Sequence, residues 1–170
     1  MQELALRYAA KYATTRAKLR LYLARKLRER GWEGTREPDL EALSNRFAEL
    51  GYVDDAAFAL NQSRSLASRG YGERRLAEKL RSAGVEEPDS AAASAHAQRE
   101  AVAAALRFAE RRRFGPFASA AADRPQIEKW TAAMVRAGHS FGLARIVASM
   151  MPGAEINRDQ LSEFAPLTDV

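Results

Sequence analysis

Hydrophobic residues recur at intervals of three and four along almost the whole chain, and the alternation typical of half-buried strands is nearly absent. In one segment Leu19, Leu23 and Leu27 form a stripe at i, i+4 spacing, which is the pattern of an amphipathic helix. The periodicity therefore predicts an all-α protein. The expected helices cover residues 2–13, 15–30, 39–50, 54–69, 72–83, 89–113, 124–138 and 140–151.

Three of these helices are expected to end in the same way. An apolar residue is followed four positions later by glycine and then by a bulky apolar residue, which is the spacing of a Schellman motif. Glycine takes the left-handed conformation there, and the residue after it folds back on the helix. The three sets are Leu27, Gly31 and Trp32; Phe47, Gly51 and Tyr52; and Leu80, Gly84 and Val85.

Polar residues with a preference for helix N-caps precede several of the expected helices. Thr14 or Thr15 is placed to cap the second helix, Asp54 the fourth and Asp123 the seventh. Asp54 and Asp55 also have the form of a catalytic or metal-binding carboxylate pair. Capping is the preferred interpretation, because the neighbouring residues supply the other parts of a helix start.

An internal repeat is visible in the glycine and aromatic residues beside the expected helix ends. The segment YGERRL at 71–76 lines up with FGLARI at 141–146. The aligned aromatics, Tyr71 and Phe141, are either base-stacking platforms or, in the preferred interpretation, core anchors between helices. A repeat of this length predicts small three-helix modules that bury their apolar faces against neighbours.

The helices and the repeat suggest four divisions of the chain. The first repeat, at 1–36, is atypical, and the second covers 37–87. The third, at 88–153, has a long alanine-rich first helix. The remaining tail, 154–170, lacks clear periodicity and is expected to be frayed or loosely docked.

Composition and charge narrow the function. The 170 residues contain no cysteine, which excludes disulfides and thiolate sites, and no apolar run is long enough to span a bilayer. With no pattern of a signal peptide, we expect a soluble cytoplasmic protein. The formal net charge is +5, and residues 1–36 alone hold ten Lys/Arg against three Asp/Glu. Segregated positive charge of this kind favours a polyanionic partner.

An enzymatic function is not expected. His96 lies in the alanine-rich helix and His139 beside a helix break, where an exposed turn residue is predicted. Neither has carboxylates at the spacing of a metal site, and no phosphate-binding glycine loop is present. No catalytic residue, cofactor or metal is therefore predicted. Trp32 and Trp130 are expected to be core residues.

The candidate binding residues are basic side chains on the expected helices. Their alternative is a solvated surface without a partner. Arg75 and Arg145 recur in the two aligned segments, which favours a structural role such as bonding a helix C-terminus. Arg111 to Arg113 lie at the C-terminus of a long expected helix. Three adjacent cations cannot all interact with that terminus, so at least one is available to a polyanion. The candidates are Lys18, Arg25, Arg28, Arg64, Arg69, Arg74, Arg75, Lys79, Arg81, Arg111, Arg112 and Arg113.

The run GYVDDAAFALNQSRSLASRGYGERRLAEKLRSAGV, beginning at Gly51, resembles the signature of the RecX regulatory proteins. The segments TTRAKLRLYLARKLRERGW and MVRAGHSFGLARIVASM resemble the first and third repeats of that family. The resemblance implies tandem three-helix repeats in an elongated, curved array. The chain departs from the family pattern where Arg16 and Lys18 replace the short acidic start of the long helix in the first repeat.

What the resemblance implies about function is regulation of DNA repair and of the SOS response. Family members bind the RecA recombinase filament on DNA and inhibit recombination, ATP hydrolysis and coprotease activity. The expected partners are therefore a RecA filament and single- or double-stranded DNA, with no membrane and a monomeric regulator. Two alternatives are a sequence-independent DNA- or RNA-binding module and a purely protein-binding helical repeat.

Overall fold

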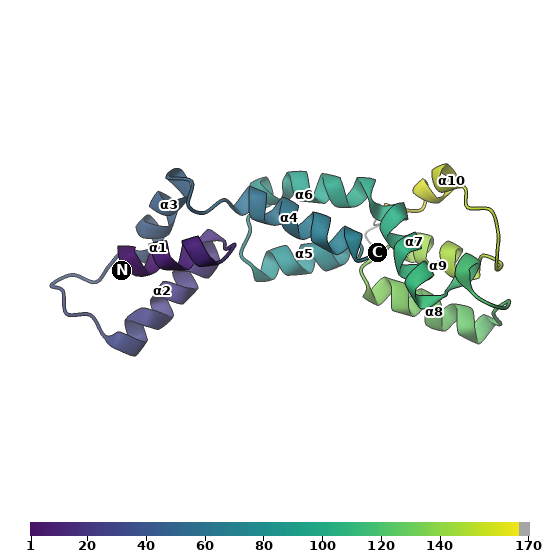
Figure 1. Ribbon diagram of the computed structural model, residues 1–170, viewed down its shortest axis with the longest axis horizontal. Helices are drawn as coiled ribbons and strands as arrows, with labels where there is room; N and C mark the ends of the chain where they lie inside the picture. Colours follow the sequence, from purple (N-terminus) through teal and green to yellow (C-terminus); the bar gives the residue numbers. More distant parts are fainter. Residues whose placement is uncertain (167–170) are drawn as a thin grey trace. The chain divides into compact units, whose positions relative to one another are not determined.

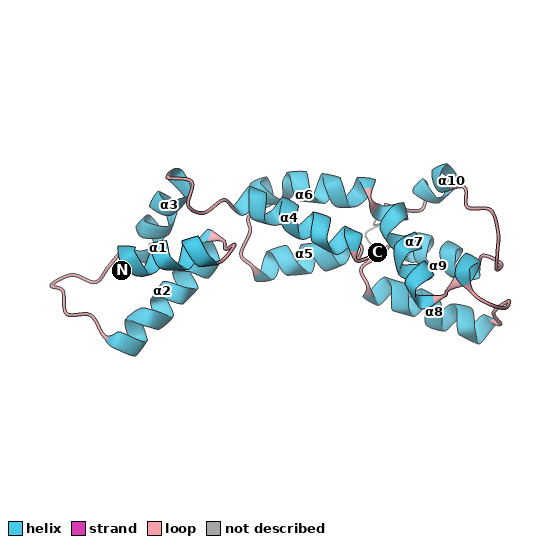
Figure 2. Ribbon diagram, in the orientation of Figure 1, coloured by secondary structure: helices cyan, strands magenta, loops and turns pink. Residues whose placement is uncertain are grey.

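The computed structural model describes residues 1–166, and all regular structure in that part of the chain is helical (Figure 1, Figure 2). The predicted all-α fold class is confirmed. The helices are α1 (Gln2–Lys11), α2 (Arg16–Arg30), α3 (Leu40–Glu49), α4 (Asp55–Ser68), α5 (Glu73–Ser82), α6 (Glu87–Arg99), α7 (Ala101–Arg112), α8 (Arg124–Arg136), α9 (Phe141–Ser149) and α10 (Arg158–Ser162), with a 3₁₀ turn, η1 (Gly115–Phe117).

The chain forms two compact units. The N-terminal unit comprises Met1–Leu60 with Leu80–Ala92, and the C-terminal unit comprises Asn61–Lys79 with the chain from Ala93 onward. The boundaries fall within α4, α5 and α6. The division into repeats expected from the sequence is a different one and stays a prediction.

The core of the N-terminal unit lies among α1, α2 and α3. Leu19 and Leu23 have no exposed surface and pack with Ala5, Phe47 and Val53. The leucine stripe predicted for α2 is therefore confirmed for Leu19 and Leu23, whereas Leu27 is half-buried. The stripe fixes which face of this helix remains for solvent.

Helix α2 begins at a partly buried ion pair. The backbone N–H of Arg16 donates to Oδ1 of Asp55 at 2.9 Å, and its Nε donates to Oδ2 at 3.2 Å. A terminal guanidinium nitrogen donates to Asp89 at 2.7 Å. The Asp55 side chain is only 3% exposed, and its hydrogen bond raises the pKa of the Arg16 guanidinium. The ion pair joins the start of α2 to the first turns of α4 and α6.

A second polar contact supports the same helix start. The Thr15 hydroxyl caps α2 by accepting the Lys18 N–H at 3.1 Å and donates to the Ala83 carbonyl at 2.6 Å. Asp54 caps α4 by accepting the Ala57 N–H at 2.8 Å. The capping interpretation is confirmed for Asp54, whereas its neighbour Asp55 is the buried partner of Arg16 and not a second cap.

Two of the three predicted Schellman ends are confirmed. The Tyr52 N–H donates to the Phe47 carbonyl at 2.9 Å, and Val85 makes the equivalent bond to Leu80 at 3.1 Å. The third prediction is wrong. Gly31 has an extended ψ of 179°, so the chain leaves the helix instead of folding back, and Trp32 is 43% exposed.

A Schellman motif also ends two further helices, and their positions show that the predicted repeat was aligned in the wrong register. The N–H of Tyr71 donates to the Leu66 carbonyl at 3.0 Å, and that of His139 donates to Met134 at 3.2 Å. These bonds make Tyr71 equivalent to His139, two residues away from the expected Phe141. The sequence alignment followed an aromatic-glycine pair, but the helix ends follow the glycines at the preceding positions, 70 and 138.

The corrected register explains two wrong predictions. His139, predicted to be an exposed turn residue, is 2% exposed and lies edge-on to Phe108 at 5.9 Å. Phe141, predicted to be a core anchor, is 61% exposed because it is the first residue of α9. Tyr71 packs against the core of the C-terminal unit as predicted. Trp130 is half-buried, with its ring stacked on Phe114 at 5.1 Å.

The predicted single helix at 89–113 is two helices. The chain changes direction at Glu100, which lies between α6 and α7 (Figure 1). Helix α6 buries only alanines, Ala93 and Ala97, whereas α7 buries seven of its twelve residues. Alanine-rich periodicity did not indicate the break, because it is set by tertiary packing.

The tail is docked rather than frayed up to residue 166. Helix α10 places Leu161, 4% exposed, in the core of the C-terminal unit. The Ser140 hydroxyl donates to the Phe164 carbonyl at 2.6 Å and holds the chain after α10 against the start of α9. A helix of five residues is too short to show periodicity, which is why the sequence did not predict it. The part of the tail prediction that covers 167–170 lies outside the described residues.

We expect the buried His139 to make stability dependent on pH. Burial lowers its pKa from 6.5 to about 4, and its Nε2 donates to the Gly70 carbonyl at 3.1 Å. Below pH 6.5 the His139 imidazole is protonated in the unfolded chain but stays neutral in the folded chain. The free energy of unfolding therefore falls as the pH is lowered towards 4. The loss is expected to total about 3 kcal/mol. Urea unfolding between pH 7 and 4 measures it.

His139→Gln is the control for this prediction, because it keeps a donor towards Gly70 but does not titrate. Carboxylates contribute equally to both proteins and cancel in the difference. A difference in unfolding free energy between the two proteins that does not change with pH contradicts the prediction.

The Arg16–Asp55 ion pair is expected to be a major source of stability in the N-terminal unit. Asp55→Asn removes the charge from a buried acceptor and is expected to cost about 1.5–3 kcal/mol of unfolding free energy. Asp54→Asn makes the same chemical change one residue earlier. It is expected to cost less than about 0.5 kcal/mol, because Asn and Asp cap helices equally well. Urea unfolding compares the two, and equal losses would show that the ion pair is unimportant.

Candidate nucleic-acid interface

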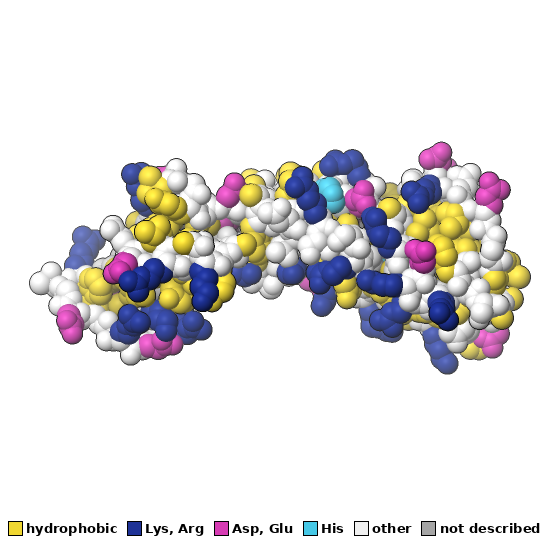
Figure 3. All heavy atoms as spheres, in the orientation of Figure 1, with side chains coloured by type: hydrophobic (Ala, Val, Ile, Leu, Met, Phe, Trp, Pro, Cys, Tyr) yellow, Lys and Arg dark blue, Asp and Glu magenta, His cyan; other side chains and the backbone are white. Residues whose placement is uncertain are grey.

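The predicted basic residues belong to both units. Lys18, Arg25 and Arg28 lie on α2 and Arg81 on α5 in the N-terminal unit. The C-terminal unit holds the others. Figure 3 shows Lys and Arg side chains gathered over α1 and α2, and again around the part of the C-terminal unit formed by α4, α7 and α8. Which of them bind a ligand stays a prediction.

The three candidates on α2 differ in how far they are engaged within the fold. Lys18 is half-buried, with its ammonium 4.7 Å from the centre of the Phe58 ring. Arg25 is exposed and lies 3.6 Å from a Glu29 carboxylate oxygen. Arg28 is exposed and has no ion-pair partner within residues 1–166. Arg28 is thus the most available of the three to an anionic partner.

The turn between α4 and α5 is held by backbone hydrogen bonds to the turn between α8 and α9. Gly72 N–H donates to the Ala137 carbonyl at 3.0 Å, and Arg74 N–H donates to the Gly138 carbonyl at 3.1 Å. A side chain on Gly72 would overlap the Gly138 carbonyl, and Gly138 has a φ of 97° that favours glycine. Two glycine turns therefore form a rigid base for the arginines that follow.

These arginines are engaged to different degrees. The Nε of Arg69 donates to the Ser65 carbonyl at 3.0 Å, and its guanidinium lies 5.6 Å from the Tyr71 ring. Arg75, expected to bond a helix C-terminus, instead pairs on the surface with Glu78 at 3.1 Å. Arg69 thus makes the helix-terminal bond that was expected of Arg75. Arg74 is exposed and unpaired in the part of the chain that the structure describes.

The arginines at the end of α7 are all exposed. Arg113 adopts the left-handed conformation, with φ 55°, and ends the helix without a glycine. The guanidinium of Arg112 lies 5.6 Å from the Phe108 ring. Arg111 and Arg113 have no ion-pair partner among residues 1–166. The remaining candidates, Arg64 and Arg81, are exposed and Lys79 is half-buried.

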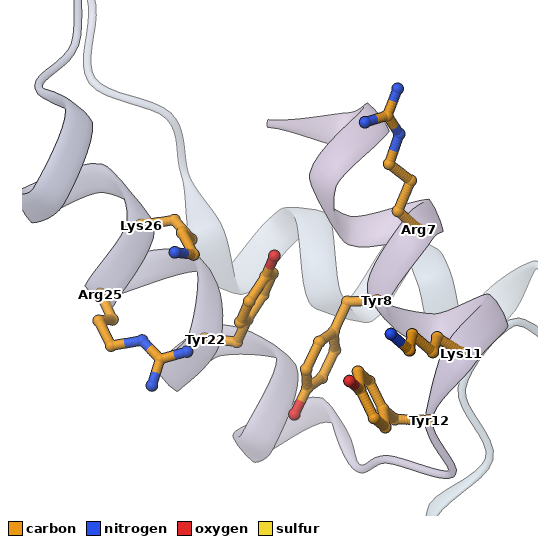
Figure 4. A pocket seen from close by; sticks show the side chains of 7 residues that line it. All are labelled: Arg7, Tyr8, Lys11, Tyr12, Tyr22, Arg25 and Lys26. Atoms are coloured by element: carbon orange, nitrogen blue, oxygen red, sulfur yellow. The ribbon is translucent and has the colours of Figure 1, made fainter.

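The sequence reasoning missed a cluster of aromatic and basic residues between α1 and α2. The cluster lines an open cavity of about 490 Å³ (Figure 4). It consists of Tyr8, Tyr12 and Tyr22 with Arg7, Lys11, Arg25 and Lys26. Tyr8 and Tyr12 are spaced i, i+4, which is a signal for a shared helix face. Their proximity to Tyr22 depends on how α1 packs on α2, which no local pattern indicates.

Residues 1–166 contain neither a cluster of metal-ligating side chains nor a membrane-spanning helix. There, no group of three or more His, Cys, Asp or Glu side chains is arranged to hold a metal ion. No helix in the same region has the length and apolar character needed to cross a bilayer.

Comparison with known proteins agrees with the resemblance found in the sequence. Residues 54–93 match the family described as RecX, second three-helix domain, and cover α4, α5 and the first part of α6. A protein of Myxococcus xanthus (strain DK1622) named Regulatory protein RecX is 32% identical over 160 residues, which are 89% of this chain and 86% of the relative.

Two further relatives carry the same name. The one from Agrobacterium fabrum is 34% identical over 158 residues, or 90% of this chain and 82% of its own. The one from Mycobacterium sp. (strain KMS) is 39% identical over 88 residues, or 51% of this chain and 46% of its own. With a three-helix domain match inside an all-α structure and relatives of this identity along nearly its whole length, the chain belongs to the RecX family of regulatory proteins.

Proposed function

We propose that this protein binds a RecA recombinase filament on DNA and inhibits strand exchange, ATP hydrolysis and coprotease activity without chemistry of its own. Membership in a family of regulatory proteins supports this role. The observation that carries the proposal is a set of exposed arginines, on helices or at their ends, that have no ion-pair partner within residues 1–166. Among the candidates predicted from the sequence, those that also lack a side-chain hydrogen bond or ring contact in that region are Arg28, Arg64, Arg74, Arg81, Arg111 and Arg113.

Unpaired arginines favour a polyanionic partner for a physical reason. A cation already paired with a carboxylate must lose that partner before it binds phosphate, which reduces the gain. A free guanidinium neutralises a phosphate directly and releases a condensed counterion. Phosphate contacts would then supply much of the affinity for the filament, and contacts to the recombinase would supply selectivity.

Several binding modules on one chain would strengthen this interaction. Helical repeats at 1–36, 37–87 and 88–153 would each contact a neighbouring part of the filament. Once the first contact has formed, the others would bind at a high effective concentration. A modest interface per repeat then suffices. Occupation of the filament blocks DNA exchange or the addition of recombinase subunits.

Titration of the full-length chain into a RecA ATPase assay on single-stranded DNA tests the proposal. We expect ATP hydrolysis to fall as the ratio of this protein to RecA rises, because bound regulator occupies the filament. The measurement is made at low salt, where phosphate contacts are strongest. Full ATPase activity at saturating protein contradicts the proposal. Equal binding to bare DNA and to filament, with a steep loss in salt, supports the sequence-independent nucleic-acid module instead.

Arg74 and Arg75 offer a matched pair for the binding face. Arg74 is unpaired, whereas Arg75 is paired with Glu78. We expect Arg74→Gln to reduce the salt dependence of filament binding by about one phosphate contact, because one counterion fewer is released. Arg75→Gln is expected to change it much less. Fluorescence anisotropy at several salt concentrations measures the slope, and circular dichroism checks that helix content is retained. Equal slopes for the two variants count against a role for Arg74.

A further inference from the structure

The cavity between α1 and α2 in the N-terminal unit contains a ladder of three tyrosine rings. Tyr8 lies between the other two (Figure 4). Its ring is nearly parallel to that of Tyr22, with centroids 4.1 Å apart and an angle of 12°. Tyr12 follows at 5.2 Å and 48°. Tyr12 is 50% exposed, so the ladder ends at a ring that leaves room for one more planar group.

The fold makes incomplete use of these tyrosines. Ring stacking between Tyr8 and Tyr22 helps to join α1 to α2, and phenylalanine would serve that purpose equally well. None of the three hydroxyl groups has a hydrogen-bond partner within residues 1–166. None of them is a buried polar atom without a partner, so all three hydroxyl groups are open to solvent.

Cations flank both ends of the ladder. The Lys11 ammonium lies 5.4 Å from the centre of the Tyr12 ring, and the Arg25 guanidinium lies 5.7 Å from that of Tyr22. Lys26 lines the same cavity and bonds Glu29 at 2.6 Å, which lowers the pKa of that carboxyl group.

Two carboxylates balance part of this charge. Arg25 and Lys26 share the single carboxylate Glu29, and Arg7 pairs with Glu3 at 2.6 Å. Lys11 has no ion-pair partner in the part of the chain that the structure describes. The four cations that line the cavity therefore exceed the two neighbouring acids, and the surroundings of the ladder remain positive.

We propose that this tyrosine ladder binds single-stranded nucleic acid, with an unstacked base placed on Tyr12 and an adjacent phosphate held by Lys11. Aromatic rings interleaved with cations suit a ligand that alternates planar bases and anionic phosphates. A duplex does not present the faces of its bases to such a ring. A cationic ligand is disfavoured by the surrounding charge. The inference deepens the proposed function by naming the form of nucleic acid that this unit contacts.

The test uses the full-length chain without recombinase, so that its outcome is independent of RecA inhibition. Anisotropy of a labelled oligo-dT of about 15 nucleotides, and of a duplex of equal length, measures binding. Tyr12→Leu removes the ring and keeps apolar volume. We expect it to weaken oligo-dT binding about ten-fold and to leave duplex binding within about two-fold, because stacking on one base accounts for this much affinity. Tyr12→Phe is expected to bind like the unaltered chain.

Tyr52→Leu is the matched control. Tyr52 is another half-exposed tyrosine of the same unit, 53% exposed and tilted on Phe47, and it is not part of the ladder. The Tyr52→Leu substitution is expected to leave oligo-dT binding unchanged. Unchanged oligo-dT binding by Tyr12→Leu, or equal losses for oligo-dT and duplex, overturns the proposal. So does displacement of oligo-dT by a poly-glutamate peptide of equal charge, since that outcome assigns binding to charge alone.

Photocrosslinking keeps the proposal testable if Tyr12→Leu does not fold. Oligonucleotides that carry 5-iodouracil are irradiated with the unaltered protein, and the attached peptide is identified by mass spectrometry. We expect attachment to Tyr8 or Tyr12, and attachment only within the C-terminal unit overturns the proposal. Binding of oligo-dT and of oligo-U both support base stacking, and the ratio of their affinities tells which polymer this site prefers.

Discussion

Burial of one negative charge governs the arrangement of the N-terminal unit. Asp55 is almost fully buried, and its desolvation is offset only because Arg16 donates to it from both backbone and side chain. Arg16 also reaches Asp89, so one guanidinium fixes the starts of three helices. The sequence departs from its family pattern at this residue, and the ion pair gives that departure a structural reason. The position of α2, and therefore of every cation and tyrosine on it, depends on this contact.

The C-terminal unit is fixed by backbone rather than by charge. Two glycine turns bond one another through Gly72 and Gly138, and His139 is buried neutral beside them. Because the backbone of Gly72 lies directly against the backbone of Gly138, no larger residue fits at Gly72. The turn carries Arg74, whose own N–H belongs to the contact. A turn held by these bonds limits the backbone freedom that binding must remove, which favours affinity for a partner.

The sequence predicted what local backbone chemistry decides and missed what tertiary contacts decide. The bounds of most helices and the ends at Gly51 and Gly84 follow from residues within one turn, and these predictions were confirmed, whereas the break at Glu100 was not predicted. Arg16 and Asp55 are 39 positions apart, and no local pattern pairs them. The tyrosine ladder, likewise, depends on how two helices meet. The predicted exposures of His139 and Phe141 were wrong for one reason. The repeat was aligned by side-chain type, whereas the helix ends set its register.

The sequence-wide charge of +5 conceals three kinds of cation with different consequences for binding. Arg16 is half-buried, and its guanidinium is already bonded to Asp55 and Asp89. Arg25 and Arg75 are surface cations paired with a neighbouring carboxylate, which an incoming phosphate must displace. Arg74 and Arg111 have no such partner in the described part of the chain. Counterion release therefore depends on the third kind, and affinity for a polyanion follows the number of free guanidinium groups more closely than it follows net charge.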